Sequence, residues 1–441
     1  MRTAEPLQSA VVEDLRPSIW RDRDFVRLWS AGTISIFGTL VSRTALPFVA
    51  ILVLGAGAIE VSTLRALELV AGLIVGLFAG AWVDRLRRRP IMVAADLGRA
   101  ALLGSIPVAA IAGFLGLGQL FVVAFVAAIL TTFFDLADRA YLPTLVPKDR
   151  LVAANGALTA SSSAAEFTGF GIGGVLVQVL TAPIAIAVDA ISFVVSAILI
   201  RGIRRPEPPP PPAGDREPML EEIGAGLRLV ARSPVLRALA LASAFSHVTW
   251  GIFGAVYLLY ATNELGLGPA AIGLIAGVGG LSSFVGAVLA ERVVVRLGVG
   301  PTLLLGIAGF GLGNALIPLA PSGAIVLAAI CLIGQQLATD GVATIYDIVD
   351  MSVRQSTVND RQLGRVNATI RTSTLLLQLA ATIFAGIVGE LAGLRTVLWI
   401  ALVGAMGAFL VVWLSPLRTM RTVPIGPFGP AMIGDEVPIT E

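Results

Sequence analysis

Several ionisable side chains lie inside long apolar stretches of this sequence, among them Arg43, Glu68, Glu166, His247 and Asp340. Placing an ionised side chain at the centre of a lipid bilayer costs about 2.5–3.5 kcal/mol on insertion scales, so such residues pair with one another or serve a function. The chemistry open to them is proton binding, ion pairing and recognition of a charged ligand. We take them as the first candidates for a functional site.

Arg43 and Glu68 lie on consecutive apolar segments that share one turn. Counting inward from this turn at about 1.5 Å per residue places them at similar depth, within reach of each other. We therefore predict an ion pair between them. The ion pair either holds the two helices together or contributes charge to a central cavity. The sequence leaves both roles open.

Three side chains are candidates for carrying a proton. Glu166 lies midway along its segment with no cation nearby in the sequence, and a carboxyl group buried away from water tends to take up a proton. His247 is the single histidine, and histidine is the side chain that titrates closest to neutral pH. Asp340 ranks third. The alternative for each is a hydrogen-bonded structural role.

A wider set of residues has charged, polar or aromatic side chains within apolar segments. These residues are Arg43, Glu68, Trp250, Tyr257, Gln335 and Gln336.

The composition excludes several classes of protein. Of the 441 residues, 56% are hydrophobic and 14% are charged, with a mean hydropathy of +0.88. A soluble domain carries about 25% charged residues, so the surface of this chain must be covered by lipid. One cysteine and one histidine exclude a disulfide framework within the chain and a cysteine-based zinc site. The sequence contains no Walker-type phosphate loop, so we do not expect direct ATP hydrolysis.

Apolar runs of about 20 residues predict twelve membrane-spanning helices. We place them at 28–53, 61–83, 91–114, 118–137, 152–179, 183–201, 236–260, 269–291, 301–319, 322–349, 365–390 and 394–415. With both termini in the cytoplasm, all cations lie at the cytoplasmic side except Arg43, Arg65, Arg99 and Arg395. This asymmetry is typical of the positive-inside rule. We expect a multi-pass protein of the plasma membrane with both termini cytoplasmic.

A distinct segment at residues 202–235 divides the predicted helices six and six. It contains a polyproline run at 208–212, expected to be extended and solvated. Residues 219–232 follow, with a pattern that favours a helix along the membrane surface; its apolar face consists of Leu220, Ile223, Leu227 and Val230. The predicted organisation is a cytoplasmic tail (1–25), a six-helix bundle (26–201), a cytoplasmic linker (202–235), a second six-helix bundle (236–416) and a second cytoplasmic tail (417–441).

A short signature follows the second predicted helix, Gly80-Ala-Trp-Val-Asp84-Arg85-Leu-Arg87-Arg88-Arg89. A glycine lets another helix approach closely, an aspartate is stabilised near the N-terminus of a neighbouring helix, and the arginines hold the turn on the cytoplasmic side. The stretch resembles the loop signature G-x-x-x-D-R-x-G-R-R of the major facilitator superfamily, with Arg87 in place of a glycine.

Other stretches are similar to the enterobactin-exporter and macrolide-efflux branch of that superfamily. They include Asp24-Phe25-Val-Arg27, Asp96-Leu-Gly-Arg99, Asp189-Ala-Ile-Ser-Phe193 and Gly364-Arg365-Val-Asn367-Ala368. The resemblance covers about residues 20–420 and implies two pseudo-symmetric six-helix bundles. It also implies a gating role for Gly80, Asp84, Arg85, Arg88 and Arg89, in which Asp84 braces the helix near 366–368. The alternative is a charge cluster that only sets the topology.

The resemblance bears on three further features. In the resembled fold, the helices that carry the wider set of polar and aromatic residues line a central cavity, so we expect these residues to border it. In the resembled fold, Asp96, Arg99 and Asp189 lie on peripheral helices, and we interpret them as structural. The fifth predicted helix carries Gly169-Phe170-Gly171-Ile172-Gly173-Gly174, which is similar to the G-P-x-x-G-G element of drug/proton antiporters with Phe170 in place of the proline. This element is either a seam for close helix packing or part of an antiport mechanism.

Taken together, these features predict a secondary transporter: a proton-coupled exporter of amphipathic small molecules such as drugs, macrolides or siderophore-like metabolites, working by alternating access. The proton gradient is the expected energy source, without a cofactor. A flippase for lipids or envelope precursors, or an importer, is the alternative within transport. A transporter-like receptor or scaffold that does not transport is the alternative from another class. We expect no enzymatic activity, no metal site, no nucleic-acid partner, and a monomer in the lipid bilayer.

Overall fold

The computed structural model describes residues 19–83, 86–207 and 219–422, and within these ranges every regular element is a helix. The first bundle contains α1 (Arg23–Phe48), continued by the π-helical turn η3 (Val49–Val53), then α2 (Ala58–Val83), α3 (Arg88–Ile111), α4 (Leu117–Leu145), α5 (Leu151–Leu180) and α6 (Ala182–Arg201). The second bundle contains α8 (Pro234–Asn263), α9 (Pro269–Leu297), α10 (Val299–Asn314), α11 (Leu316–Leu319), α12 (Ile325–Thr357), α13 (Asp360–Ala392) and α14 (Leu394–Leu414).

The predicted fold class, twelve membrane-spanning helices in two bundles of six, is confirmed. In the described part of the chain, 11 helices are long and apolar enough to cross a membrane, with α10 and α11 forming one of these spans. The remaining span is α2, whose first half carries the charged side chains Glu60, Arg65 and Glu68.

Several helices extend beyond the apolar runs that predicted them. α4 ends at Leu145, α9 at Leu297 and α12 at Thr357, each several residues past the predicted boundary, and α13 begins at Asp360. An apolar run marks only the part of a helix that contacts lipid. Backbone hydrogen bonding continues into water, where polar side chains are no longer excluded.

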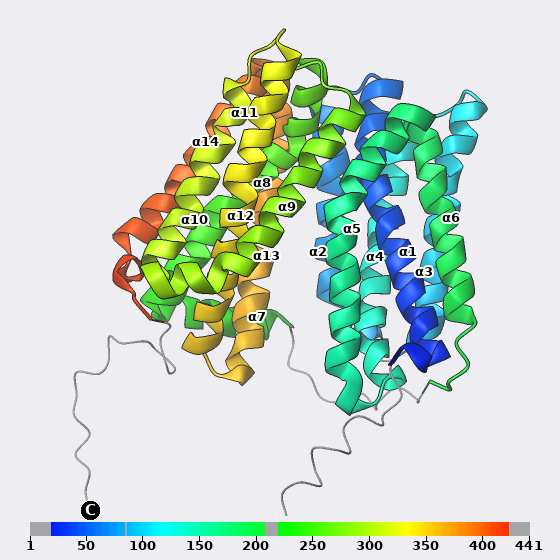
Figure 1. Ribbon diagram of the computed structural model, residues 1–441, viewed down its shortest axis with the longest axis horizontal. Helices are drawn as coiled ribbons and strands as arrows, with labels where there is room; N and C mark the ends of the chain where they lie inside the picture. The colour runs from blue at the N-terminus through cyan, green and yellow to red at the C-terminus, as the bar shows by residue number, and fades with distance from the viewer. Residues whose placement is uncertain (1–18, 84–85, 208–218, 423–441) are drawn as a thin grey trace, which may run out of the picture.

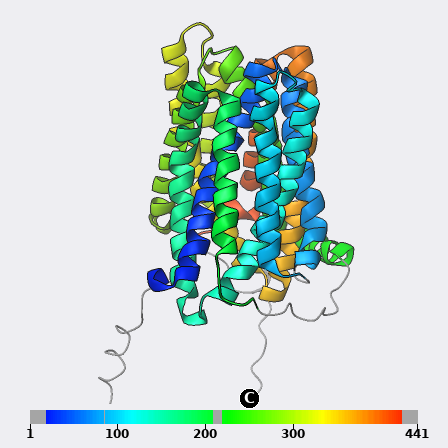
Figure 2. The same cartoon turned by 90° about the vertical axis from the view of Figure 1, so that its right-hand side faces the viewer.

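The two bundles stand side by side, with their helices running in roughly the same direction (Figures 1 and 2). We call the end that holds α7 (Met219–Arg232), the start of α1 and the end of α6 the linker end, and the opposite end the far end (Figure 1). The bundles pack against each other in the far half of the molecule through α5 with α9 and α2 with α13. Toward the linker end their ribbons diverge (Figure 1).

Glycines allow this far-end contact. A Cβ atom on Gly174 of α5 would lie 2.9 Å from the Cα of Gly273 of α9 and would overlap the carbonyl oxygen of Pro269. In the other pair, Gly386 of α13 faces the Ser62 side chain of α2. In the glycine element of the fifth predicted helix, Gly174 therefore forms a packing seam with α9 of the second bundle, while Gly169 and Gly173 face α1 of the first.

α7 packs on the second bundle. Its Val230 is buried in a cluster with Leu236, Val366 and Ile370, whereas Leu227 is exposed. The predicted apolar face is thus divided: one side chain contacts the protein and another remains open to the surroundings. The side chains of Leu220 and Ile223 lie outside the described residues.

Candidate functional site

A cavity of about 1200 Å³ lies between the two bundles. Its walls come from α1 and α5 on one side and from α8, α9, α10, α11 and α12 on the other. The predicted residues Arg43, Glu166, Trp250, Tyr257, Gln335, Gln336 and Asp340 all line it. Glu68 and His247 are not among the lining residues within the described part of the chain.

Arg43 of α1 and Glu166 of α5 face the cavity from the first bundle, and both side chains are exposed to it. Within the described ranges, neither forms a hydrogen bond or an ion pair, although their charges interact across the cavity wall. The expectation that Glu166 is a buried carboxyl group was therefore wrong. The nearby cation comes from a helix far away in the sequence, which sequence-local counting does not find.

The predicted ion pair between Arg43 and Glu68 was also wrong. Glu68 pairs instead with Arg65, one turn earlier on α2, with 2.5 Å between Arg65 Nη1 and Glu68 Oε2. Depth counting placed Arg43 and Glu68 at the same level but ignored the direction in which each side chain leaves its helix. Arg43 points toward the cavity, and Glu68 is satisfied by its own helix.

A polar network forms part of the opposite wall. The buried Gln335 donates from Nε2 to Thr339 Oγ1 at 2.9 Å and to Asn314 Oδ1 at 3.4 Å. Thr339 Oγ1 lies 3.0 Å from Asp340 Oδ1. Gln335 Oε1 is buried without a hydrogen-bond partner among the described residues. Asn314 was missed, although an amide within an apolar run is the signal that identified Gln335.

Aromatic rings supply most of the remaining surface. Trp250 of α8 lies against Phe310 of α10, with 5.6 Å between ring centroids and an interplanar angle of 39°. The other aromatic residues of the lining are Phe167, Phe170, Phe253, Tyr257 and Phe284. Such rings bury large apolar areas and also attract cations through their faces.

His247 makes a local contact on α8. Its Nδ1 lies 2.8 Å from the carbonyl oxygen of Ser243, one turn earlier. His247 also lies near Asp347 of α12. A role for His247 in proton coupling stays a prediction.

The predicted gating signature is described in part. Gly80 lies near the end of α2, and Asp84 and Arg85 fall outside the described residues. Arg88 and Arg89 donate their backbone N–H groups to the carboxylate of Glu207, over 2.5 and 3.2 Å. Glu207, which the sequence interpretation missed, thus caps the start of α3 from the linker, where a negative charge is favourable.

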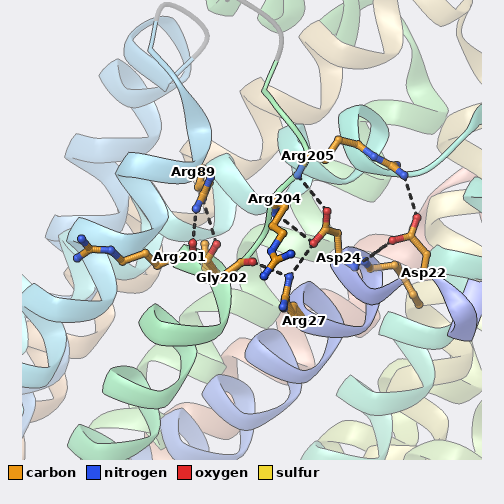
Figure 3. Close-up of polar contacts among 10 residues, drawn as sticks. Asp22, Asp24, Arg27, Arg89, Arg201, Gly202, Arg204 and Arg205 are labelled. Carbon is orange, nitrogen blue, oxygen red and sulfur yellow. Dashed lines mark hydrogen bonds and ion pairs between the residues drawn. The ribbon is translucent and has the colours of Figure 1, made fainter.

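A second set of contacts holds the start of the linker to α1 (Figure 3). Asp24 accepts hydrogen bonds from the backbone N–H groups of Arg204 and Arg205 at 3.1 and 3.0 Å, and Arg27 donates to the carbonyl oxygen of Gly202 at 2.6 Å. Arg89 donates to the carbonyl oxygens of Ile200 and Arg201 at the end of α6 (Figure 3). The described arginines of the signature therefore fix the linker to the first bundle.

The chain forms two six-helix bundles that enclose a polar and aromatic cavity and pack together on one side of it. This arrangement defines a membrane transporter. The chain belongs to the Major Facilitator Superfamily, which it matches over residues 28–349 and 239–430. It is a transporter rather than an enzyme. It lies in the lipid bilayer and binds small molecules. The predicted family resemblance is confirmed.

Curated relatives include transporters and efflux proteins. The chain is 28% identical over 318 residues to the uncharacterized MFS-type transporter y4rN of Sinorhizobium fredii, covering 68% of this chain and 72% of that protein. It is 27% identical over 368 residues to the multidrug efflux pump Tap of Mycolicibacterium fortuitum, covering 79% and 85%. It is 26% identical over 222 residues to macrolide efflux protein A of Streptococcus pyogenes, covering 49% and 53%.

Solved structures share the fold. A bacterial homologue of the iron transporter ferroportin in its inward-facing state superposes with a TM-score of 0.73 at 16% identity, covering 91% of this chain and 100% of that chain. The outward-facing state of a bacterial ferroportin homologue superposes with a TM-score of 0.54 at 18% identity, covering 88% and 98%.

Proposed function

We propose that this protein is a proton-coupled exporter of amphipathic small molecules that works by alternating access. The observation that carries the proposal is the cavity of about 1200 Å³ between the bundles. It combines an aromatic lining with three charged side chains, Arg43, Glu166 and Asp340. A ligand with both an apolar body and a polar or charged group would satisfy both kinds of surface.

The size of the cavity supports substrates of drug size or larger, because typical ligand pockets measure about 300–1,000 Å³. The relatives that are named as multidrug and macrolide efflux proteins support the same substrate class and the direction of transport. Aromatic walls tolerate different ligand shapes, since stacking does not require a fixed hydrogen-bond pattern.

The linker end is the cytoplasmic end in this proposal. Arg88, Arg89, Arg204 and Arg205 gather there, as the positive-inside rule requires for short loops. The far-end contacts then close the outer face, and the molecule is in an inward-open state. The higher TM-score with an inward-facing structure, 0.73 against 0.54, supports this assignment. We further propose that the protein works as a monomer in the plasma membrane.

Proton coupling is assigned to a carboxyl group of the cavity. Glu166 and Asp340 line the cavity, whereas His247 is occupied by a contact within its own helix. Glu166 ranks first because it forms no hydrogen bond or ion pair among the described residues, whereas Asp340 is in contact with Thr339. Binding a proton at Glu166 would change the charge that an incoming substrate meets in the cavity.

Reconstitution tests the proposal and its alternatives. Proteoliposomes would be loaded with a pH-sensitive dye and presented with a macrolide, an aromatic cationic dye and a siderophore-like catechol. Substrate-dependent proton movement opposite to substrate flux is the expected result. Movement in the same direction would indicate an importer, and translocation of a labelled lipid alone would indicate a flippase. Substrate binding without any flux would indicate a receptor.

A further inference from the structure

A second group of ionisable side chains lies inside the first bundle, away from the cavity. Asp96 and Arg99 of α3 and Asp189 of α6 are 0%, 2% and 0% exposed. Arg99 Nη2 lies 2.5 Å from Asp96 Oδ1. The Arg99 guanidinium also lies over the rings of Phe134 and Phe193, 4.5 and 4.1 Å from their centroids. Arg99 is therefore held by Asp96 and by two aromatic faces.

Among the described residues, no cation is bound directly to Asp189. The Ser192 hydroxyl donates to Asp189 Oδ1 at 3.0 Å, while Oδ2 is buried without a hydrogen-bond partner among the described residues. The Ser42 hydroxyl of α1 faces the same carboxyl group and has no satisfied hydrogen bond of its own. The charged groups that face Asp189 are Arg99 and Asp96, both of α3.

The charges of this cluster do not balance if both carboxyl groups are ionised. The Arg99 guanidinium faces three carboxyl groups, those of Asp96, Asp189 and Asp135 of α4, and its ion pair is made with Asp96. An ionised carboxylate buried without a partner is so unfavourable that the group takes up a proton instead. The α1 backbone closes the pocket on the other side, because a Cβ atom on Gly38 would overlap Asp189 Oδ1 and Ser192 Oγ.

We propose that Asp189 is a proton-binding site and holds a proton in the conformation described here. The proton would also complete the hydrogen bonding of the pocket, since a neutral carboxyl group donates one bond to an acceptor such as Ser42 Oγ. Exchange of this proton during the transport cycle would then be a coupling step. That second part rests on the proposed proton-driven export.

α1 links this site to the cavity. Gly38 and Ser42 face Asp189, and Arg43, the next residue along α1, faces the cavity. Release of the proton would place a negative charge directly behind the helix that carries Arg43. The charge state of Asp189 would therefore act on the cavity through α1 and not through contact with substrate.

Infrared spectroscopy tests the site independently of transport. A protonated carboxyl group has a C=O stretching band that a carboxylate lacks. In difference spectra of the purified protein, Asp189→Asn should remove one such band and Asp96→Asn should leave it in place. Ser42→Ala should shift the same band, because it removes the facing hydroxyl. If the protonated band persists in Asp189→Asn, or if Ser42→Ala leaves every band unshifted, Asp189 is not the proton site.

Transport measurements test the coupling step. Asp189→Asn keeps the shape and neutrality of the protonated side chain, so exchange of substrate across the membrane without a gradient should continue. Proton-driven accumulation should fall at least tenfold. Unchanged accumulation in Asp189→Asn would show that Asp189 takes no part in coupling. The infrared result alone would then decide whether Asp189 binds a proton. A wild-type protein without any proton-driven flux would instead refute the proposed function.

Discussion

The carboxylate of Glu390, on α13, accepts a hydrogen bond from the backbone N–H of Ala58, the first residue of α2, over 3.3 Å. This bond joins the two bundles at the far end, beside the close contact of Ser62 with Gly386. An exposed N–H group at the start of a helix is well suited to a negative charge. Opening of the far end must break this bond.

Glu390→Ala should therefore weaken far-end closure. A hydrogen bond of this kind contributes about 0.5–1.5 kcal/mol, which corresponds to an increase of up to about tenfold in the far-end-open population. Thiol labelling of a cysteine introduced at Ser62, in a Cys331→Ser background, reports the opening. The matched control is Glu60→Ala, because Glu60 caps Gly57 over 2.9 Å within the same bundle. Equal labelling rates in both variants would exclude Glu390 as a contact that holds the far end closed.

The glycine seam gives a sharper steric prediction. Gly174→Ala places a methyl group 2.9 Å from Gly273 Cα, so the far end should fail to close and export should fall at least tenfold. Gly171→Ala on the same helix is the control, since its nearest neighbour would lie at 3.8 Å. Dye efflux from cells that express equal amounts of each protein measures the difference. Similar loss in both variants would argue against a steric seam.

Glu166→Gln tests the carboxyl group of the cavity. The substitution keeps the shape of the side chain but removes its proton exchange, so proton-driven export should fall at least tenfold while substrate still binds. The dependence of export on pH should flatten. Glu68→Gln is the control, because Glu68 pairs with Arg65 outside the cavity wall. An unchanged pH profile in Glu166→Gln would move the coupling role to Asp340 or Asp189.

Glu207→Ala should release the linker from the first bundle. The substitution removes the acceptor for two backbone N–H groups at the start of α3, those of Arg88 and Arg89. Loss of such a cap costs about 0.5–2 kcal/mol, measured as a lower thermal midpoint of the purified protein. Arg204→Ala should have little effect, because Arg204 bonds to Asp24 through its backbone. A midpoint for Glu207→Ala equal to that of Arg204→Ala would contradict this capping role.

The sequence predicted the spans and much of the cavity for one physical reason. Polar side chains inside lipid are costly, so Glu166, Asp340, Gln335 and Gln336 stand out within apolar runs and do line the cavity. The same signal marks Asn314, which was overlooked. Helix ends were less predictable, because helices continue past the lipid into water.

Pairings between distant segments were not predictable from the sequence. The Arg43–Glu68 prediction failed because depth along a helix says nothing of the direction of a side chain around it. The capping of α3 by Glu207 joins positions 119 residues apart in the sequence, and nothing local to either position indicates it. The charge interaction between Arg43 and Glu166 likewise depends on how α1 and α5 pack.

Pulsed electron paramagnetic resonance on spin-labelled pairs tests the central claim, alternating access around the cavity, most directly. In a Cys331→Ser background, labels at the exposed positions Ile59 and Leu391 report the far end, and labels at the exposed positions Val152 and Val295 report the linker end. In the presence of an imposed proton gradient and substrate, the far-end distance should lengthen as the linker-end distance shortens. Distances that stay fixed at both ends, or that lengthen together, would contradict the account.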